Sequence, residues 1–189
     1  MELAIGIIGL VVGIIIAIIP YYRSKYFLRP EVTIEMTSDG GISAPRGFSS
    51  KNKVNDEGYI DGNTAIRVFE LTWRFKIKIT NNSELTAFYP ELEFNPNGPK
   101  FKIDKINRLE PIKPAEGLEL NAEYTKYEEA TGKDRTKIGE APPTEFKDLE
   151  LLFGYENSKK RRFFTLFDFN SAENKNQFLR NKPKDYKNN

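Results

Sequence analysis

The chain opens on an unbroken apolar run from Leu3 to Ile19, built only of Leu, Ala, Ile, Val and Gly. At about 1.5 Å per helical residue the run covers about 26 Å, close to the roughly 30 Å hydrocarbon layer of a bilayer. A core helix of a soluble domain carries a polar stripe, which this run lacks. A cleaved secretory signal is disfavoured because no Lys or Arg precedes the run and no small-x-small motif follows it. The pattern predicts a retained, single-pass signal-anchor within residues 1–22.

The segment after the run combines aromatic rings with positive charge, as expected at a membrane–water interface. Its basic residues flank the C-terminal end of the run, whereas only the α-amine and Glu2 flank the start. Because Lys and Arg next to a span stay on the cytoplasmic side, we expect the N-terminus outside and the remaining chain in the cytoplasm, at the inner (plasma) membrane. Residues 23–30 form the expected juxtamembrane linker. The residues assigned to interface anchoring are Tyr21, Tyr22, Arg23, Lys25, Tyr26 and Arg29.

Small residues recur at four-residue intervals inside the apolar run, at Gly9, Gly13 and Ala17. This spacing places them on one face of a helix, where two backbones can approach closely and pack. It predicts self-association, or pairing with another membrane protein, through the transmembrane helix. Gly and Ala are also common in transmembrane helices that do not pair, so a simple anchor stays open as the alternative.

Beyond residue 30 the hydrophobic pattern changes to a period of two. Residues Phe69–Thr80 alternate apolar and polar side chains without a break, which describes a long strand with one buried and one wet face. Asn81, Asn82 and Ser83 then form a turn cluster. A sequon in that cluster is irrelevant if the domain is cytoplasmic. The strand candidates, each a short apolar or alternating segment, are 31–37, 69–80, 87–94, 101–106, 117–124, 149–155 and 162–169.

About seven short strands with turns between them, and no long amphipathic helix, favour an all-β fold. We expect an antiparallel β-sandwich over residues 31–170. Residues 171–189 are expected to hold a polar, basic tail that starts with a short helix over Ser171–Arg180, with Ser171 as its N-cap.

A recognisable order of motifs runs through Phe75–Ser83, Leu109–Leu120, Leu152–Asn157 and Phe163–Thr165. This order resembles immunoglobulin-like or fibronectin-III-like sandwiches of bacterial envelope proteins, in which a strand ends at an Asn-x-Ser turn and a Leu-x-Pro bend leads into the next strand. The chain departs from that pattern in lacking a Cys pair between the sheets and in its two long insertions. The resemblance implies a fold and no activity.

The two insertions, Ser38–Asn63 and Thr125–Glu145, are predicted to be loops. Structureless loops of more than about 12–15 residues within a compact domain are usually functional or disordered. They are candidates for binding surfaces, and the alternative is that they are solvated connections between distant strands.

Composition removes most enzyme classes. The 189 residues include no Cys and no His, which excludes thiol nucleophiles, Ser-His-Asp arrangements, and thiolate or imidazole zinc sites. Asp56, Glu57 and Asp61 lack the spacing of a calcium loop. Nothing in the sequence places two carboxylates across a cleft for acid–base hydrolysis. We therefore expect no enzymatic activity, no cofactor and no metal.

Charge is nearly balanced, with 29 basic against 27 acidic residues, so a nucleic-acid partner is disfavoured. The densest basic cluster is Lys159–Arg162, within a predicted hairpin loop. Such a cluster can contact anionic lipid, although the favoured interpretation is a charged hairpin tip that keeps a sheet edge soluble.

Two functional hypotheses follow. In the favoured one, the protein is a membrane-tethered, non-enzymatic protein-interaction or scaffolding module, because confinement to a membrane raises the effective concentration of its partners. In the alternative, the β-domain senses a small ligand, for example a nucleotide, and drives the helices to oligomerise. That layout resembles the short transmembrane effectors of bacterial anti-phage systems. The helix face of small residues favours the alternative, whereas the lack of a phosphate-cradling Gly-rich loop disfavours it.

Overall fold

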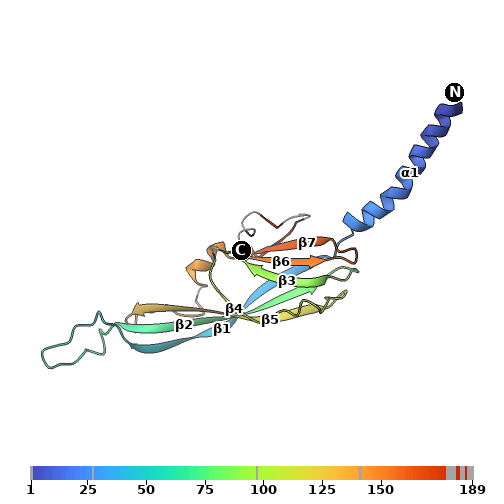
Figure 1. The fold of residues 1–189 in the computed structure, drawn as a ribbon. Coiled ribbons are helices and arrows are strands. Elements are labelled where there is room, and N and C mark those ends of the chain that lie inside the picture. The colour runs from blue at the N-terminus through green and yellow to red at the C-terminus, as the bar shows by residue number, and fades with distance from the viewer. Residues whose placement is uncertain are drawn as a thin grey trace.

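The computed structural model describes residues 2–26, 28–96, 98–140, 142–177, 182–183 and 186, and the side chains of residues 2–8, 23–26 and 176–177 fall outside that description. Figure 1 shows one long helix, α1 (Glu2–Tyr26), leading into a β-domain. The β-domain consists of two four-stranded antiparallel sheets, which confirms the all-β prediction. The described residues form eight strands, where the sequence predicts about seven.

The first sheet has the strand order β1-β2-β5-β4 and the second has the order β3-β6-β7-β8. The first comprises β1 (Val32–Phe48), β2 (Arg67–Asn81), β4 (Lys102–Ile103) and β5 (Gly117–Ala130), and the second comprises β3 (Phe88–Phe94), β6 (Glu150–Glu156), β7 (Arg162–Asp168) and β8 (Glu173–Gln177). A short 3-10 helix, η1 (Thr144–Asp148), precedes β6.

The alternation predicted for residues 69–80 is realised in β2. Leu71, Ile77 and Ile79 are fully buried in the core between the sheets, while Lys76 and Lys78 on the other face are exposed. The opposing sheet contributes Phe153 and Tyr155 of β6 and Phe163 and Phe167 of β7 to the same core. The period-2 pattern therefore specifies which face of β2 lies inside.

The second sheet is buried on its outer face as well. Leu152, Phe164 and Leu166 pack there around Tyr186 of the C-terminal segment. Lys182, in the same segment, pairs with Glu93 of β3 at 2.6 Å. This second cluster explains why β6 and β7 are apolar at consecutive positions and do not alternate.

The prediction that the two insertions are loops is wrong over much of their length. β1 continues to Phe48 and β5 continues to Ala130, and both remain paired with β2 from Trp73 back to Arg67. We call this three-stranded extension, residues 41–48, 67–73 and 124–130 with the tip loop 49–66, the arm. Figure 1 shows the arm projecting beyond the second sheet, at the end of the molecule opposite α1.

The predicted helix over Ser171–Arg180 is also wrong, because residues 173–177 form strand β8 and residues 178–180 lie outside the described residues. The Asp168 carboxylate accepts the backbone N–H of Asn170 at 3.0 Å and closes a turn that returns the chain onto β7. Asn174 then binds the edge of β1 twice, accepting from the Ile34 N–H at 2.8 Å and donating to the Ile34 carbonyl at 2.9 Å. Tertiary pairing outweighs a weak helix signal here.

The helix predicted at the N-terminus is present as α1, which runs for 25 residues and contains Pro20. Within the part of α1 whose side chains are described, and elsewhere among the described residues, no helix is both long and apolar enough to cross a bilayer.

Candidate interaction surfaces

The segment that leaves α1 is fastened to the second sheet by two hydrogen bonds. The Tyr155 hydroxyl donates to the Pro30 carbonyl at 2.9 Å, and the Asn157 amide donates to the Leu28 carbonyl at 3.1 Å. Burial raises the pKa of the Tyr155 phenol above its ordinary value, so the hydroxyl keeps its proton and stays a donor. Because both contacts hold backbone carbonyls, residues 28–30, which follow α1, are held in place against β6 and the turn after it.

Asn157 also builds the turn between β6 and β7. Its side-chain oxygen accepts the N–H groups of Lys159 at 2.9 Å and Arg161 at 3.0 Å, and the Lys160 N–H bonds the Asn157 carbonyl at 2.9 Å. We call residues 157–161 the basic hairpin. One asparagine thus connects the exit of α1 to three consecutive basic residues, which lie at the α1 end of the sandwich (Figure 1).

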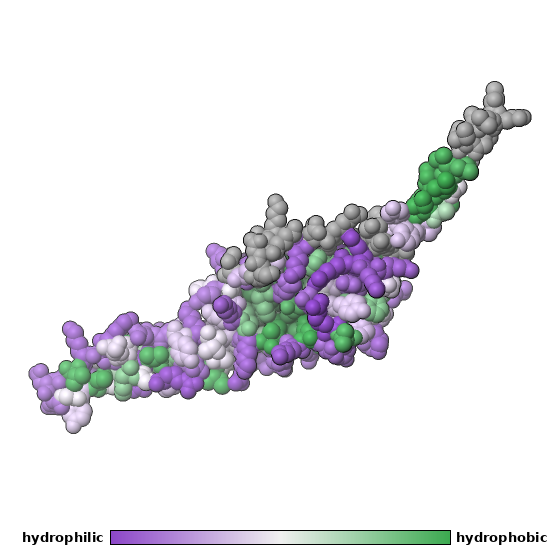
Figure 2. Space-filling view, viewed as in Figure 1, coloured by the Kyte–Doolittle hydropathy of each residue, from purple (hydrophilic) through white to green (hydrophobic). Residues whose placement is uncertain are grey.

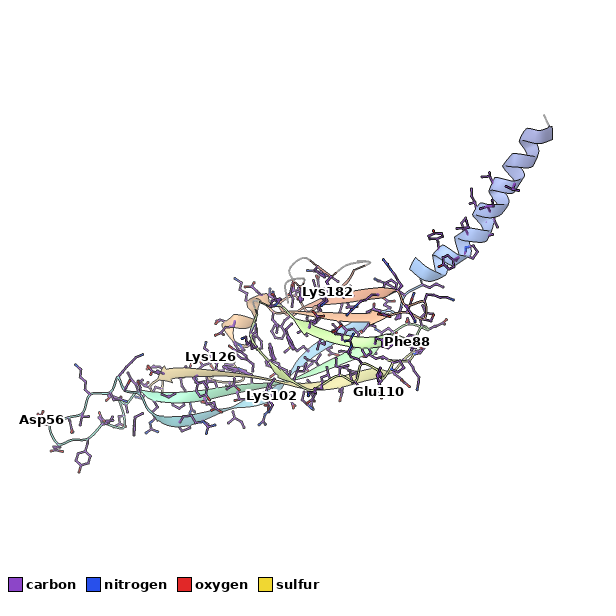
Figure 3. The ribbon with its side chains drawn as sticks, in the orientation of Figure 1. Asp56, Phe88, Lys102, Glu110, Lys126 and Lys182 are labelled. Carbon is purple, nitrogen blue, oxygen red and sulfur yellow. The ribbon has the colours of Figure 1, made fainter. Side chains whose placement is uncertain are left out.

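A hollow of about 400 Å³ lies beside the basic hairpin. Leu28, Leu85 and Phe88 supply apolar lining, and Glu84 and Lys159 supply charged groups. Figure 3 places Phe88 at the α1 end of the sandwich, far from Asp56 at the tip of the arm. The two ends of the molecule therefore present separate surfaces.

The residues predicted to pack or anchor the helix all belong to α1 or to the linker. A Cβ added at Gly9 or at Gly13 would meet no atom within 4 Å, and Ala17 is exposed, so this face of α1 is open. Tyr21 and Tyr22 are exposed and meet edge to face at 5.7 Å between ring centroids. The linker residue Arg29 lies at the start of the sandwich. The side chains of Arg23, Lys25 and Tyr26 lie outside the described part of the chain.

The inner face of the arm is covered by the segment 131–140. The Arg135 guanidinium lies 5.5 Å above the ring of the buried Phe69. The Thr136 N–H and hydroxyl donate to the Glu128 carboxylate at 2.5 Å and 2.6 Å. Ile138 packs where β1 carries Gly41, and a Cβ at Gly41 would overlap both the Ile138 methyl and the Thr72 carbonyl. Glycine is required there for this close approach.

The outer face of the arm is cross-linked by charge. The Glu70 carboxylate accepts two hydrogen bonds from the Arg46 guanidinium, both at 2.8 Å, and one from the Tyr127 hydroxyl, also at 2.8 Å. The bond from Arg46 is the main cause of a lowered pKa at Glu70, and the bond to Glu70 raises the pKa of Tyr127. Since each partner lies on a different strand, this cluster joins β1, β2 and β5.

The tip loop has its own internal hydrogen bonds. The Asn52 side chain donates to the carbonyls of Ser49 and Ile66 and accepts the Ile66 N–H at 2.7 Å. Asp61, one of the acidic residues considered for calcium, instead accepts from the Asn63 N–H and the Thr64 hydroxyl. The described residues contain no group of three or more acidic or imidazole side chains arranged to hold a metal. The loop is an ordered structure without a metal cluster in its described part.

Apolar side chains are exposed along the far part of the arm. Tyr59 is 68% exposed, Val54 59% and Phe48 54%. Figure 2 shows apolar atoms among polar ones at this end of the molecule. Three exposed apolar side chains on a projecting element make the far part of the arm a candidate surface for another protein. From the sequence, this insertion is a candidate binding surface, but no pattern there singles out these apolar residues.

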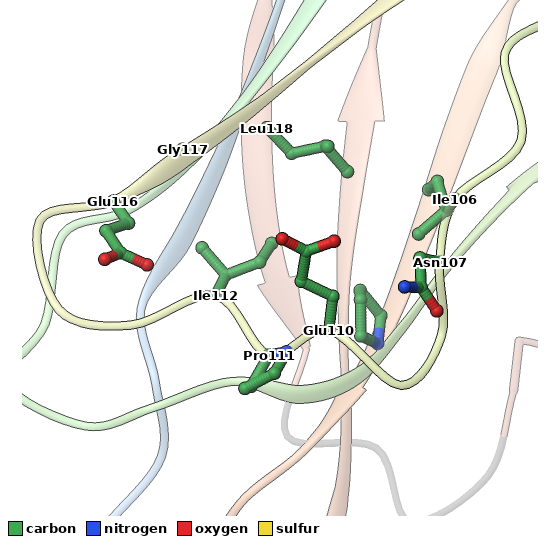
Figure 4. Close-up of a pocket in the computed structure, with 9 residues that line it drawn as sticks. Ile106, Asn107, Glu110, Pro111, Ile112, Glu116, Gly117 and Leu118 are labelled. Carbon is green, nitrogen blue, oxygen red and sulfur yellow. The ribbon is translucent and has the colours of Figure 1, made fainter.

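A smaller pocket of about 80 Å³ lies at the start of β5, opposite Pro90 of β3. Figure 4 shows the Glu110 side chain extending between Ile112 and Leu118, with Glu116 at the pocket's other side. The Lys113 ammonium lies 3.5 Å from the Glu116 carboxylate. The volume is too small for a drug-sized ligand, so we assign it no site.

Comparison with protein-family models, with curated proteins and with solved structures gives no match. The resemblance to immunoglobulin-like sandwiches therefore stays a prediction. A function for this chain must be argued from its own geometry.

Proposed function

We propose that the protein is a single-pass membrane-anchored module whose β-sandwich presents the arm to a protein partner at the cytoplasmic face of the membrane. The observation that carries this proposal is the arm itself. Three paired strands project beyond the second sheet, opposite α1, and end in an ordered loop with exposed apolar side chains. The role is non-enzymatic, and the partner is another protein or a second copy of the chain.

The membrane part of the proposal rests on α1 and on the sequence around it. A helix of 25 residues is about 38 Å long, longer than the roughly 30 Å hydrocarbon layer. The apolar run begins at Leu3, before the first helix residue whose side chain is described. Exposed Tyr21 and Tyr22 follow the run at the position where aromatic side chains anchor a span to the headgroups.

The arm is suited to binding because it is already ordered. Covering the side chain of Phe48, Val54 or Tyr59 stabilises a complex by up to about 1.5–3 kcal/mol for each large apolar group. The Glu70 cluster and the Asn52 bonds hold the arm and its loop before any partner arrives, which reduces the entropy lost on binding. Tethering adds effective concentration without new contacts.

In-cell photo-crosslinking tests the proposal. A photoreactive amino acid replaces Tyr59 at the tip, and a matched control replaces Lys78, which is exposed on the sandwich. We expect a discrete cross-linked species from position 59 and none from position 78. Equal or absent cross-linking at both positions would refute the role of the arm. Alkaline carbonate extraction of the membranes tests the anchor separately, since a peripheral protein is released and a spanning one is retained.

The alternative, a ligand-gated membrane effector, is favoured by a cleft of about 220 Å³ beside the arm's inner face. Trp73 lines this cleft, and its buried indole N–H has no hydrogen-bond partner among the described residues. A ligand that bears an acceptor could supply one. The variants Gly9→Ile and Gly13→Ile separate the two functions. If the variants lose the protein's effect in the cell but still localise to the membrane, regulated helix packing is supported. If the cellular effect and the localisation are both unchanged, the simple tether is supported.

A further inference from the structure

We propose that the basic hairpin, residues 157–161, binds the anionic headgroups of the bilayer that holds α1. This inference rests on the membrane anchor of the proposed function and adds a second, electrostatic contact to it. It assigns the α1 end of the sandwich to the lipid surface and leaves the arm free for a partner.

The hairpin lies close to the expected membrane surface. If the hydrocarbon layer ends near Ile19, the seven residues to Tyr26 rise about 10 Å along the helix. The headgroup layer occupies roughly 5–7 Å of that distance. Leu28 lies two residues beyond Tyr26, and its carbonyl accepts a hydrogen bond from Asn157 at the base of the hairpin. The lysines are therefore held within about one Debye length, roughly 8–10 Å, of the headgroups.

The charges at the tip of the hairpin are available. Lys159 and Lys160 are exposed, and neither forms an ion pair within the described residues. Glu84 lines the same hollow as Lys159 without pairing with it in that part of the chain. By contrast, Lys126 pairs with Glu145 at 2.5 Å and Lys182 with Glu93 at 2.6 Å. Unpaired ammonium groups beside a membrane are attracted by anionic lipid.

The opposite end of the molecule shows no such excess of positive charge. The tip loop carries Lys51 and Lys53 together with Asp56, Glu57 and Asp61, and Lys51 is paired with Glu129. The two consecutive lysines of the hairpin, Lys159 and Lys160, therefore lie at the end from which α1 departs. A lipid surface fits this arrangement better than an acidic protein, because the exit of α1 and the hairpin share Asn157.

The backbone supplies an independent observation. Lys160 has φ of +56°, in the left-handed region where Gly or Asn is favoured and a lysine is strained. Gly would adopt this conformation without a steric penalty. A left-handed lysine in place of glycine keeps an ammonium group at this tip, next to the segment that leaves α1.

Spin labelling of the full-length chain tests the inference. The protein has no Cys, so Ser158→Cys gives a single label in the hairpin and Asp56→Cys gives a matched label at the arm tip. Each is reconstituted into phosphatidylcholine vesicles with or without about 30% phosphatidylglycerol, a lipid mixture in which basic residues gain attraction from the surface. The readout is collision with a water-soluble paramagnetic reagent.

We expect the label at 158 to lose at least about threefold in collision rate when phosphatidylglycerol is present, and the label at 56 to stay unchanged. The effect should vanish in about 1 M salt, where the Debye length is roughly 3 Å. The double variant Lys159→Gln and Lys160→Gln should lower the docked-to-undocked ratio roughly 25-fold, about fivefold per charge. Lys160→Arg keeps the charge and should retain docking. Lys160→Gly removes the charge and relieves the backbone strain, so it should weaken docking about fivefold.

The outcomes separate this inference from the anchor. If the protein fails to float with pure phosphatidylcholine vesicles, the anchor of the proposed function is wrong. If it floats and the label at 158 behaves alike in both lipids, the anchor stands and the lipid-binding hairpin is refuted. Protection of the label only in native membranes, and not in purified lipid, would likewise overturn the inference in favour of an acidic protein partner.

Discussion

Replacing Asn157 by Ala should loosen the connection between α1 and the sandwich and destabilise the β-domain. Asn157 is 5% exposed, and its side chain makes three hydrogen bonds within residues 28–161 that the structure describes, two as acceptor within the hairpin and one as donor to the Leu28 carbonyl. Each contributes about 0.5–1.5 kcal/mol net, and the Lys159 N–H can be solvated when its partner is lost. We expect the free energy of unfolding to fall by about 1.5–3 kcal/mol.

Asn157→Asp separates the two roles of this residue. A carboxylate still accepts from the N–H groups of Lys159 and Arg161, but it cannot donate to the Leu28 carbonyl. The free energy of unfolding of this variant should fall by at least about 1 kcal/mol, because one hydrogen bond is lost and a carboxylate then faces the Leu28 carbonyl. Asn82→Ala is the matched control, because the exposed Asn82 amide makes one surface bond to Thr33, and surface changes stay within about 0.5 kcal/mol.

Guanidinium denaturation of the full-length protein in detergent micelles measures these changes. The chain has one tryptophan, Trp73, which is 4% exposed in the core and therefore reports unfolding of the sandwich. Hydrogen exchange adds a local readout. Exchange at the amides around Leu28 should accelerate in both variants, and exchange in the hairpin only in the Ala variant. Equal stability of the Ala variant, the Asp variant and the parent protein would refute the reasoning.

Three further predictions concern the core, the arm and pH. Phe146→Ala should lower the free energy of unfolding by about 3–5 kcal/mol, because this 1%-exposed ring contacts four other aromatic rings; the same denaturation assay checks it. Gly41→Ala should displace Ile138, so limited proteolysis should cleave segment 131–140 faster than in the parent protein. The hydrogen bond from Arg46 lowers the pKa of Glu70 in the folded protein. The ionised Glu70 therefore stabilises the fold above the ordinary pKa of 4.5, and this stabilisation is lost as pH falls through the lower pKa of the folded state. The free energy of unfolding of Glu70→Gln, measured against pH, should lack this pH-dependent part.

The sequence predicts an element well where one face is apolar and the other polar. β2 meets this condition from Phe69 to Ile79, and its predicted inner residues are the buried ones. β6 and β7 are predicted as strands from their apolar content, but periodicity alone does not show that both faces are covered. The outer cover comes from Tyr186, far along the chain in a polar tail. A contact between distant residues of unlike composition leaves no local pattern.

The strands of the arm are predicted as loops for a related reason. On its inner face β1 carries Gly41, Ser43 and Pro45, opposite Trp73, Leu71 and Phe69 of β2. Small residues there make room for the segment 131–140, so the hydrophobic alternation of β1 stops at Met36 although the strand continues to Phe48. The apolar character of this face comes mainly from β2, with Tyr124 and Ala130 of β5 packed beside it. A strand whose partner carries the hydrophobic side chains resembles a loop in sequence.

The prediction of a C-terminal helix fails at Asn174, and this residue also shows how the sandwich protects its edge. β1 is the outer strand of its sheet, so its backbone groups near Ile34 would otherwise face solvent. The Asn174 amide binds both the N–H and the carbonyl of Ile34, as a further strand would, and the Thr165 hydroxyl bonds the Val32 carbonyl at 3.2 Å. Among the described residues, β1 from Gly41 to Phe48 pairs only with β2, so this closure stops at the arm. The described part of the chain thus covers the β1 edge within the sandwich and leaves it uncovered along the arm, the element to which the proposed function assigns the partner.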